Sequence, residues 1–184
     1  MCIRDSRCSY AHVTVNGEDL GVYANVEPVK DPLLERHFGS SDGALFEGTL
    51  SDFRDGWTGS FDDKADDGDF APVEAVAAAL ESDDPVTAVG ELIDLEAWHR
   101  AWAMEVLIGH WDSYSGNTNN FYVYVDPADG KMRFIPWGID AILQGVEPFG
   151  EGAPTTIVAE AALPSALAAS DEARADYYDA RAAL

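Results

Sequence analysis

The chain has 184 residues, 47% of them apolar and 11% aromatic, so it can bury the core of one ordinary domain. Its 34 acidic residues outnumber its 11 Lys and Arg, which gives a formal net charge of -23 at pH 7. This charge disfavours nucleic acid and anionic membranes as partners; it is typical of proteins in saline or extracellular settings, with a cationic partner as the other interpretation.

The first six residues do not resemble the start of a folded domain. The codons implied by Met1–Asp5 are similar to the end of an adapter used in sequencing libraries, so we expect residues 1–6 to be an artefact. On this interpretation Arg7 lies inside a longer gene, and any signal peptide precedes it. No window of the chain approaches the roughly 18 apolar residues that a membrane-spanning helix needs. Cys8 then has no partner cysteine, and no disulfide is predicted.

The N-terminal part of the sequence predicts a β-hairpin followed by a short helix. Residues 11–15 and 20–26 alternate apolar and polar side chains on either side of the turn signal at residues 16–19. Pro32 can then open a helix through PLLERHF, and Gly39 stands where a C-terminal cap belongs.

The middle of the chain predicts one strand, one loop and two helices. Residues 44–47 predict a short strand, and the Gly- and Asp-rich segment at about 48–70 predicts a long surface loop or acidic insertion. Residues 72–81 have a helical composition. A second helix is expected after Asp94, whose carboxylate can cap residues 95–111. The second half of this helix is almost entirely apolar, which predicts that it is buried.

The last part of the chain predicts a polar loop, a second hairpin and a helical tail. The loop at residues 112–120 contains Asp, Ser, Gly and three Asn. Residues 121–125 and 132–137 then predict strands that are joined by a turn at residues 126–130. The Ala-rich and charged tail from Leu163 should be helical.

The order of these elements is that of a protein kinase from its fourth strand onward. Kinases carry H-R-D-x-x-x-x-N in the catalytic loop, with the Asp facing the substrate hydroxyl and the Asn holding a magnesium ion. Here His110-Trp111-Asp112 is followed five residues later by Asn117. Phosphoryl transfer needs these residue types because a carboxylate accepts the hydroxyl proton while hard oxygen ligands hold the metal.

Together these segments resemble the CotH kinases, a bacterial family named for a spore-coat protein. The resemblance covers most of residues 11–143, and it rests on VNGEDLGVYANVEPV, LLERHFG, ALFEG, IDLEAWHRAWAMEVLIGHWDSYSGNTNNFYVYVD and KMRFIPWGID. It implies an α+β protein-kinase-like fold that binds ATP with Mg or Mn and phosphorylates Ser or Thr hydroxyls of secreted or coat proteins. It also implies an extracellular or cell-surface location.

The resemblance implies roles for individual residues of the loop and of the segment after the second hairpin. Asp112 corresponds to the catalytic Asp. Asn120 corresponds to the amide residue beside the metal, and Asn117 is its rival by kinase spacing. The family usually has P-W-D-x-D after the hairpin, and Gly138 stands at the first of these Asp positions. Asp140 therefore has to act as the metal ligand; otherwise the metal site does not function.

The same resemblance predicts how the chain divides. Residues 7–27 correspond to the end of the small lobe and the hinge, with Glu27 where the backbone contacts adenine, and residues 28–184 correspond to the large lobe. The Gly-rich loop and Lys that grip the phosphates precede this part of a kinase, so the fragment alone is expected to be inactive or nearly so.

The principal alternative is a surface or coat protein that keeps the fold as a structural or adhesive module without transfer chemistry. Gly138 favours this alternative, whereas the intact Asp112 loop argues against it.

Overall fold

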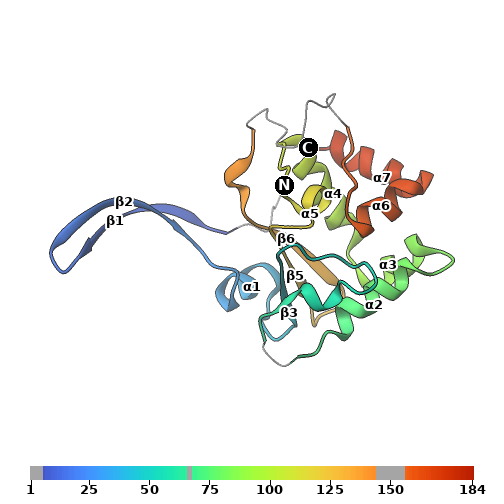
Figure 1. Ribbon diagram of the computed structural model, residues 1–184, viewed down its shortest axis with the longest axis horizontal. Helices are drawn as coiled ribbons and strands as arrows, with labels where there is room; N and C mark the ends of the chain where they lie inside the picture. The colour runs from blue at the N-terminus through green and yellow to red at the C-terminus, as the bar shows by residue number, and fades with distance from the viewer. Residues whose placement is uncertain (1–5, 66–67, 144–155) are drawn as a thin grey trace. The chain divides into compact units, whose positions relative to one another are not determined.

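The computed structural model describes residues 6–65, 68–143 and 156–184 (Figure 1). The described chain is mixed α+β, with small antiparallel sheets and several helices. It forms two units, Met1–Asp42 and Gly43–Leu184, each with its own internal contacts. None of the helices in the described residues is long and apolar enough for a membrane crossing.

The first unit contains the predicted hairpin and helix. Strands β1 (Cys8–Val15) and β2 (Glu18–Val26) pair antiparallel. The two residues between them, Asn16 and Gly17, have φ angles of 52° and 85°. A tight hairpin turn of this kind needs positive φ at both positions, which Asn and Gly tolerate best. Helix α1 (Asp31–Phe38) has Pro in its first turn and ends at the left-handed Gly39, as predicted.

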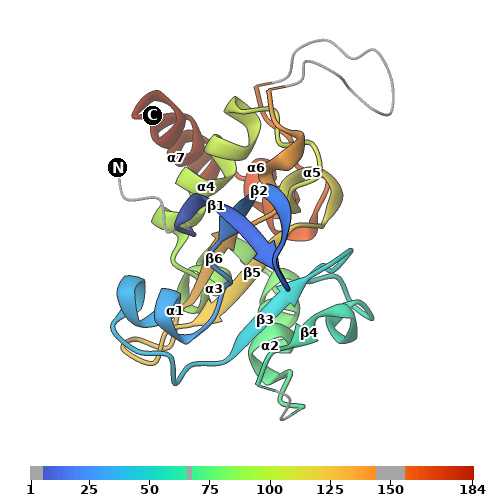
Figure 2. The same cartoon turned by 90° about the vertical axis from the view of Figure 1, so that its left-hand side faces the viewer.

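The second unit is built on a four-stranded sheet in the order β4-β3-β5-β6 (Figure 2). The strands are β3 (Leu45–Gly48), β4 (Asp62–Asp63), β5 (Phe121–Val125) and β6 (Met132–Pro136). The predicted hairpin of β5 and β6 is confirmed, with Phe121 opposite Pro136. This register brings the residue before β5 next to the residue after β6, and the Trp137 N–H donates to the Asn120 carbonyl oxygen at 3.1 Å.

Six helices accompany this sheet in the described part of the second unit. They are α2 (Ala71–Leu80), α3 (Pro85–Leu92), α4 (Leu95–Leu107), α5 (Tyr114–Asn117), α6 (Ala162–Ala169) and α7 (Asp171–Ala182). Helix α4 begins where predicted, because the Asp94 carboxylate accepts from the Ala97 N–H at 3.1 Å. The second half of α4 is not buried on all sides as predicted, since Leu107 is 44% exposed. Helices α3 and α5 were not predicted.

The core of the second unit is aromatic. The Trp98 ring lies 4.4 Å from the Phe134 ring and 5.5 Å from the Tyr114 ring, between centroids. Tyr114 in turn lies 4.6 Å from Phe121 at the start of β5. Aromatic pairs at such distances contribute about 0.5–1.5 kcal/mol beyond the area they bury. Helix α4, helix α5 and the β5–β6 hairpin are therefore fixed to one another by side chains directly beneath the polar loop.

The prediction of a surface loop at about 48–70 is wrong for part of that segment. Ser51, Asp52 and Phe53 are almost fully buried, and so is Phe61. The reason is that Phe53 and Phe61 pack against each other at 5.1 Å and insert into the aromatic core. Strand β4 also extends the sheet at its edge. The composition of this segment does not predict the burial, because the buried residues are separated by many Gly and Asp.

Candidate functional site

The polar loop begins where α4 ends. After Ile108, Gly109 adopts a φ of 64° and turns the chain, and His110 is buried directly after it. The His110 Nε2 lies 3.0 Å from the carbonyl oxygen of Trp137, so this nitrogen carries the proton and donates. His110 therefore ties the start of the loop to the segment that follows β6.

Three asparagine side chains surround the carboxylate of Asp112. Asn117 Nδ2 donates to Oδ1 at 2.7 Å, and Asn120 Nδ2 donates to Oδ2 at 2.7 Å. Asn119 Nδ2 lies 3.2 Å from both oxygens. Asn120 Nδ2 also donates to the Asp112 carbonyl oxygen at 2.9 Å. The loop thus brings together Asp112, Asn117 and Asn120, three of the five predicted site residues.

These contacts fill the hydrogen-bonding capacity of Asp112. A carboxylate has about four acceptor positions, and the three amides together occupy four. The carboxylate is held in one orientation, which suits a group that must meet a substrate hydroxyl at a defined place. Asn119 makes the longest of these contacts, so another hydrogen-bond donor would displace it most readily.

The backbone around these amides is strained. Thr118 and Asn120 have φ angles of 53°. Asn tolerates this left-handed conformation, whereas a β-branched Thr rarely adopts it. Such residues persist where surrounding contacts fix them, and they concentrate at functional sites. Here the Thr118 N–H donates to the Tyr114 carbonyl at 3.1 Å, and the Thr118 carbonyl accepts from the Ser51 N–H at 2.8 Å.

Gly138 lies against the side chain of Asn120. A Cβ atom on Gly138 would sit 2.4 Å from Asn120 Oδ1, and Gly138 has a φ of 60°. Both facts disfavour an ordinary side chain at this position, because it would be crowded by Asn120 and strained in its backbone. The carboxylate that the family resemblance leads one to expect here is absent, and the Asn120 amide oxygen lies only 2.4 Å from the position that its Cβ would take.

Asp140 lies two residues farther on, in the short turn Ile139–Ala141. Its side chain is exposed, and within residues 6–65, 68–143 and 156–184 it makes no hydrogen bond or ion pair. The described residues also contain no group of three His, Cys, Asp or Glu side chains that could hold a metal. Of the residues predicted to bind metal, Asn120 has its Oδ1 beside Gly138, and Asp140 has an exposed carboxylate.

Two protein oxygens would be enough for a metal that arrives with a nucleotide. Mg²⁺ is usually bound by one or two carboxylates together with substrate phosphates and water, and seldom by a cage made only of protein ligands. Asn120 and Asp140 could supply the protein ligands of such a metal, and the phosphates and water would supply the others. They do not fit a high-affinity site for a free cation.

Glu27 belongs to the first unit and directly follows β2. Its N–H donates to the Arg7 carbonyl at 2.9 Å, and its carboxylate pairs with Arg36 of α1, Nη2 to Oε2 at 2.6 Å. The bonds from Arg36 and from the Arg7 backbone lower the pKa of Glu27 to about 2. Its N–H is therefore engaged within the hairpin, and an adenine contact at this position would need another group. The hinge role stays a prediction.

Beneath the loop lies a buried carboxylate, Glu105, which was not predicted from the sequence. Glu105 Oε2 accepts from the Ser115 hydroxyl at 2.6 Å and from the Ser115 N–H at 3.3 Å. Burial raises the pKa of Glu105. The signal was present in the sequence, because Glu105 is the one acidic residue in the apolar half of α4. Such a residue needs a buried polar partner.

A comparison with protein families gives a match over the whole chain. The family model described as CotH kinase protein matches residues 1–184. No curated protein matches the chain.

Proposed function

The chain belongs to the CotH kinase family, and from this premise we propose that its function is that of an ATP-dependent protein kinase. The reaction is transfer of the terminal phosphoryl group of metal-bound ATP to a Ser or Thr hydroxyl of a secreted or coat protein. The observation that carries the proposal is the Asp112 carboxylate, which three amides hold in one orientation at the end of a helix.

Asp112 serves as the base in this proposal. The substrate hydroxyl replaces the Asn119 amide, whose two contacts are the longest, and donates to the carboxylate. The hydroxyl oxygen then forms a bond to the γ-phosphorus while the bond to the β–γ bridging oxygen breaks. ADP leaves, and the hydroxyl proton passes to Asp112. Asn117 and Asn120 keep the carboxylate in place during this step.

Asn120 and Asp140 would hold the divalent metal in this proposal. The metal, when bound, neutralises the charge of the β- and γ-phosphates. Asn120 is suited to this role because its amide nitrogen faces Asp112 while its oxygen faces the Gly138 segment. Asn117 binds Asp112 through its nitrogen and is assigned to orientation alone.

The decisive experiment is transfer of labelled phosphate from ATP to protein by the product of the complete gene, with Mg or Mn. We expect Asp112→Asn to lower the rate by about 10²–10⁴-fold, the usual contribution of a general base, and to leave nucleotide binding intact. Asp83→Asn is the matched control, because it removes the same charge from an exposed position. Labelling that survives Asp112→Asn at the control rate excludes Asp112 as the base.

A non-catalytic surface or coat protein is the second candidate. The observations that favour it are the filled acceptor positions of Asp112 and the glycine at position 138. On this alternative the three amides stabilise the loop and exchange with no substrate. Absence of labelling by the wild-type product of the complete gene with either metal, together with no binding of ATP in calorimetry, would support it.

A further inference from the structure

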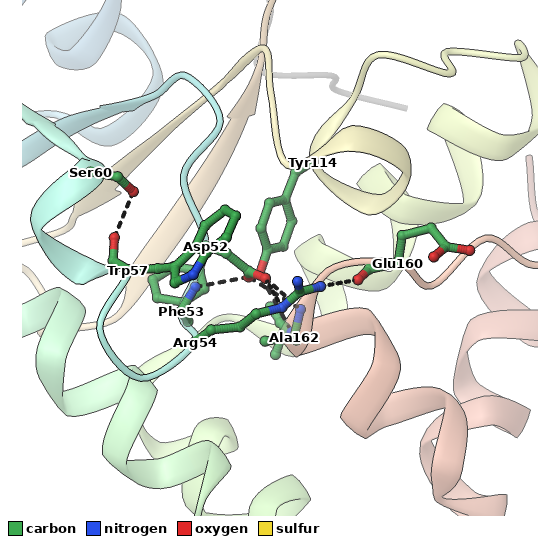
Figure 3. Close-up of polar contacts among 9 residues, drawn as sticks. Asp52, Phe53, Arg54, Trp57, Ser60, Tyr114, Glu160 and Ala162 are labelled. Atoms are coloured by element: carbon green, nitrogen blue, oxygen red, sulfur yellow. Dashed lines mark hydrogen bonds and ion pairs between the residues drawn. The ribbon is translucent and has the colours of Figure 1, made fainter. Parts of the chain in front are cut away.

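Asp52 is a buried carboxylate outside the proposed transfer site, and it joins three segments of the second unit (Figure 3). Its Oδ1 accepts from the Tyr114 hydroxyl at 2.8 Å and from the Phe53 N–H at 2.8 Å. Both oxygens lie 3.1 Å from the Ala162 N–H, the first of helix α6. Arg54 Nε pairs with Oδ2 at 2.7 Å.

The partners of Asp52 matter because burying a carboxylate without hydrogen bonds or an opposite charge costs free energy. An unpaired charge in a protein interior loses several kcal/mol of hydration, which hydrogen bonds and an opposite charge must offset. Asp52 has both, and the positive end of α6 adds a favourable dipole. The Arg54 guanidinium also donates to the Glu160 carbonyl, which fixes the chain just before α6 (Figure 3).

Tyr114 connects Asp52 to the polar loop. It is the first residue of α5 and follows Asp112 by two positions. Its ring is fully buried against Trp98 and Phe121, so the hydroxyl has one available direction. Burial, and then the charge of Asp52, raise the pKa of Tyr114 well above its usual 10.0, which keeps the hydroxyl protonated as a donor.

The same segments hold the loop at two further points. The Ser51 N–H donates to the Thr118 carbonyl at 2.8 Å, just beyond the end of α5. The Glu160 N–H donates to the Ser115 carbonyl at 2.9 Å, in the middle of α5. Helix α5 is therefore attached at its start, middle and end to chain that lies far away in sequence.

We propose that Asp52 is a positioning residue for the phosphoryl-transfer reaction proposed above, on which this inference rests. Through the Tyr114 hydroxyl it fixes the rotation of α5. Asn117 is the last residue of α5, and its amide orients the Asp112 carboxylate. Asp52 touches neither substrate nor metal. It acts by setting where Asp112 points.

Tyr114→Phe in the product of the complete gene tests this role, because it removes the hydroxyl and keeps the packed ring. Tyr177→Phe is the matched control: Tyr177 is equally buried, and its hydroxyl donates at 2.7 Å to the carbonyl of Thr156, which is not part of α5. For each variant the kcat and the KM for ATP are measured, together with amide hydrogen exchange of residues 112–120.

We expect Tyr114→Phe to lower kcat by about 10- to 100-fold with KM for ATP unchanged, since a small misplacement of a reacting group has effects of this size. Exchange of residues 112–120 should rise by about fivefold, the factor for one lost hydrogen bond. Tyr177→Phe should change neither quantity. Asp52→Asn, which turns one acceptor into a donor, should exceed Tyr114→Phe in both measurements.

An equal kcat, or equal exchange of residues 112–120, in Tyr114→Phe and Tyr177→Phe would overturn the positioning role. The exchange measurement also separates this inference from the proposed function. A wild-type protein without transfer activity removes the kinase proposal. Unchanged exchange in Tyr114→Phe removes the positioning of α5 whether or not transfer is seen.

Discussion

Asn117 and Asn120 have different environments, although kinase spacing and the family resemblance predicted the same role for them. Both donate through Nδ2 to the Asp112 carboxylate. Asn120 alone also contacts Gly138 through its amide oxygen, at the segment that leads to Asp140. In the proposed mechanism, Asn120 orients Asp112 through its nitrogen and offers its oxygen to the metal. This division is why orientation is assigned to Asn117 and metal binding to Asn120.

Gly138 is expected to tolerate a side chain only at a cost in stability. Gly138→Ala places a methyl group 2.4 Å from Asn120 Oδ1 in a left-handed backbone conformation. Gly109→Ala is the matched control, because Gly109 has a φ of 64° and no atom lies within 4 Å of the position that its Cβ would take. The control should lower the free energy of unfolding by about 1–2 kcal/mol through backbone strain alone. Gly138→Ala should lose roughly 1–3 kcal/mol more through overpacking.

Urea denaturation measures both variants. If Gly138→Ala is no less stable than Gly109→Ala, the close contact with Asn120 does not exist in solution. A confirmed difference has a consequence for engineering: restoring an Asp at position 138 requires a smaller residue at position 120 as well.

The Glu27–Arg36 pair predicts a pH dependence. The pKa of Glu27 is lowered from 4.5 to about 2, chiefly by the hydrogen bond from Arg36. A depressed carboxyl pKa means that the pair stabilises the fold above about pH 4.5 and that this stabilisation is lost as pH falls through about 2. Carbon-13 NMR of the Glu27 carboxyl should therefore show a midpoint near 2. In Arg36→Gln the midpoint should move toward 4.5, and an unmoved midpoint would show that Arg36 is not the cause.

Helix α4 begins at a capping signal that is visible in the sequence and ends at the loop of the candidate site. Asp94 caps its first turn through the Ala97 N–H, and the helix ends at the loop that carries Asp112. Asp94→Ala should lower the free energy of unfolding by about 0.5–2 kcal/mol, the usual cost of a lost cap. Asp94→Asn is the control, because Asn caps equally well but also loses the ion pair with Arg133.

Thermal and urea unfolding of the two Asp94 variants give the result. Asp94→Ala should be clearly the less stable of the two. Equal losses would assign the role of Asp94 to its charge and its Arg133 partner, and the cap would contribute little.

The elements that the sequence predicted are those with local signals. Both hairpins have their turn residues beside alternating strands, and α1 and α4 have caps that stand next to the helix in sequence. Helix α5 was missed because four residues, one of them Gly116, have too little intrinsic helix propensity. Helix α3 was missed although Asp84 and Pro85 form a regular N-terminus, since its Thr and Gly weaken the pattern.

The candidate site also has a part that the sequence predicted and a part that it did not. The grouping of Asp112 with Asn117 and Asn120 lies within nine residues of sequence; Asn117 was predicted from kinase-like spacing and Asn120 from the family resemblance. The contact between Asn120 and Gly138 depends on the register of β5 against β6, which local patterns do not give. The burial of Asp52 depends on Tyr114 and on α6, which are both distant in sequence. The Gly- and Asp-rich composition around Asp52 therefore did not predict its burial.

The whole molecule has a formal net charge of -23 with only 11 Lys and Arg. The few cations cannot pair with most of the 34 acidic side chains, so repulsion between carboxylates destabilises the compact state. A chain of this kind should also attract cationic proteins, and a basic substrate would associate faster at low salt. Both effects act through unpaired surface charge, and salt reduces both.

Salt should therefore stabilise this protein at pH 7. The Debye length falls from about 10 Å at 0.1 M to about 3 Å at 1 M, which screens repulsion among exposed carboxylates. Each 1 kcal/mol gained raises Tm by roughly 2–4 °C for a chain of this size. The control is the same NaCl series near pH 4.1, the isoelectric point, where repulsion vanishes and the salt effect should disappear. A Tm that falls with salt at pH 7 would mean that pairs such as Glu27 with Arg36 outweigh the net charge. An equal rise at both pH values would assign the effect to salting-out of apolar surface, because that effect does not depend on net charge.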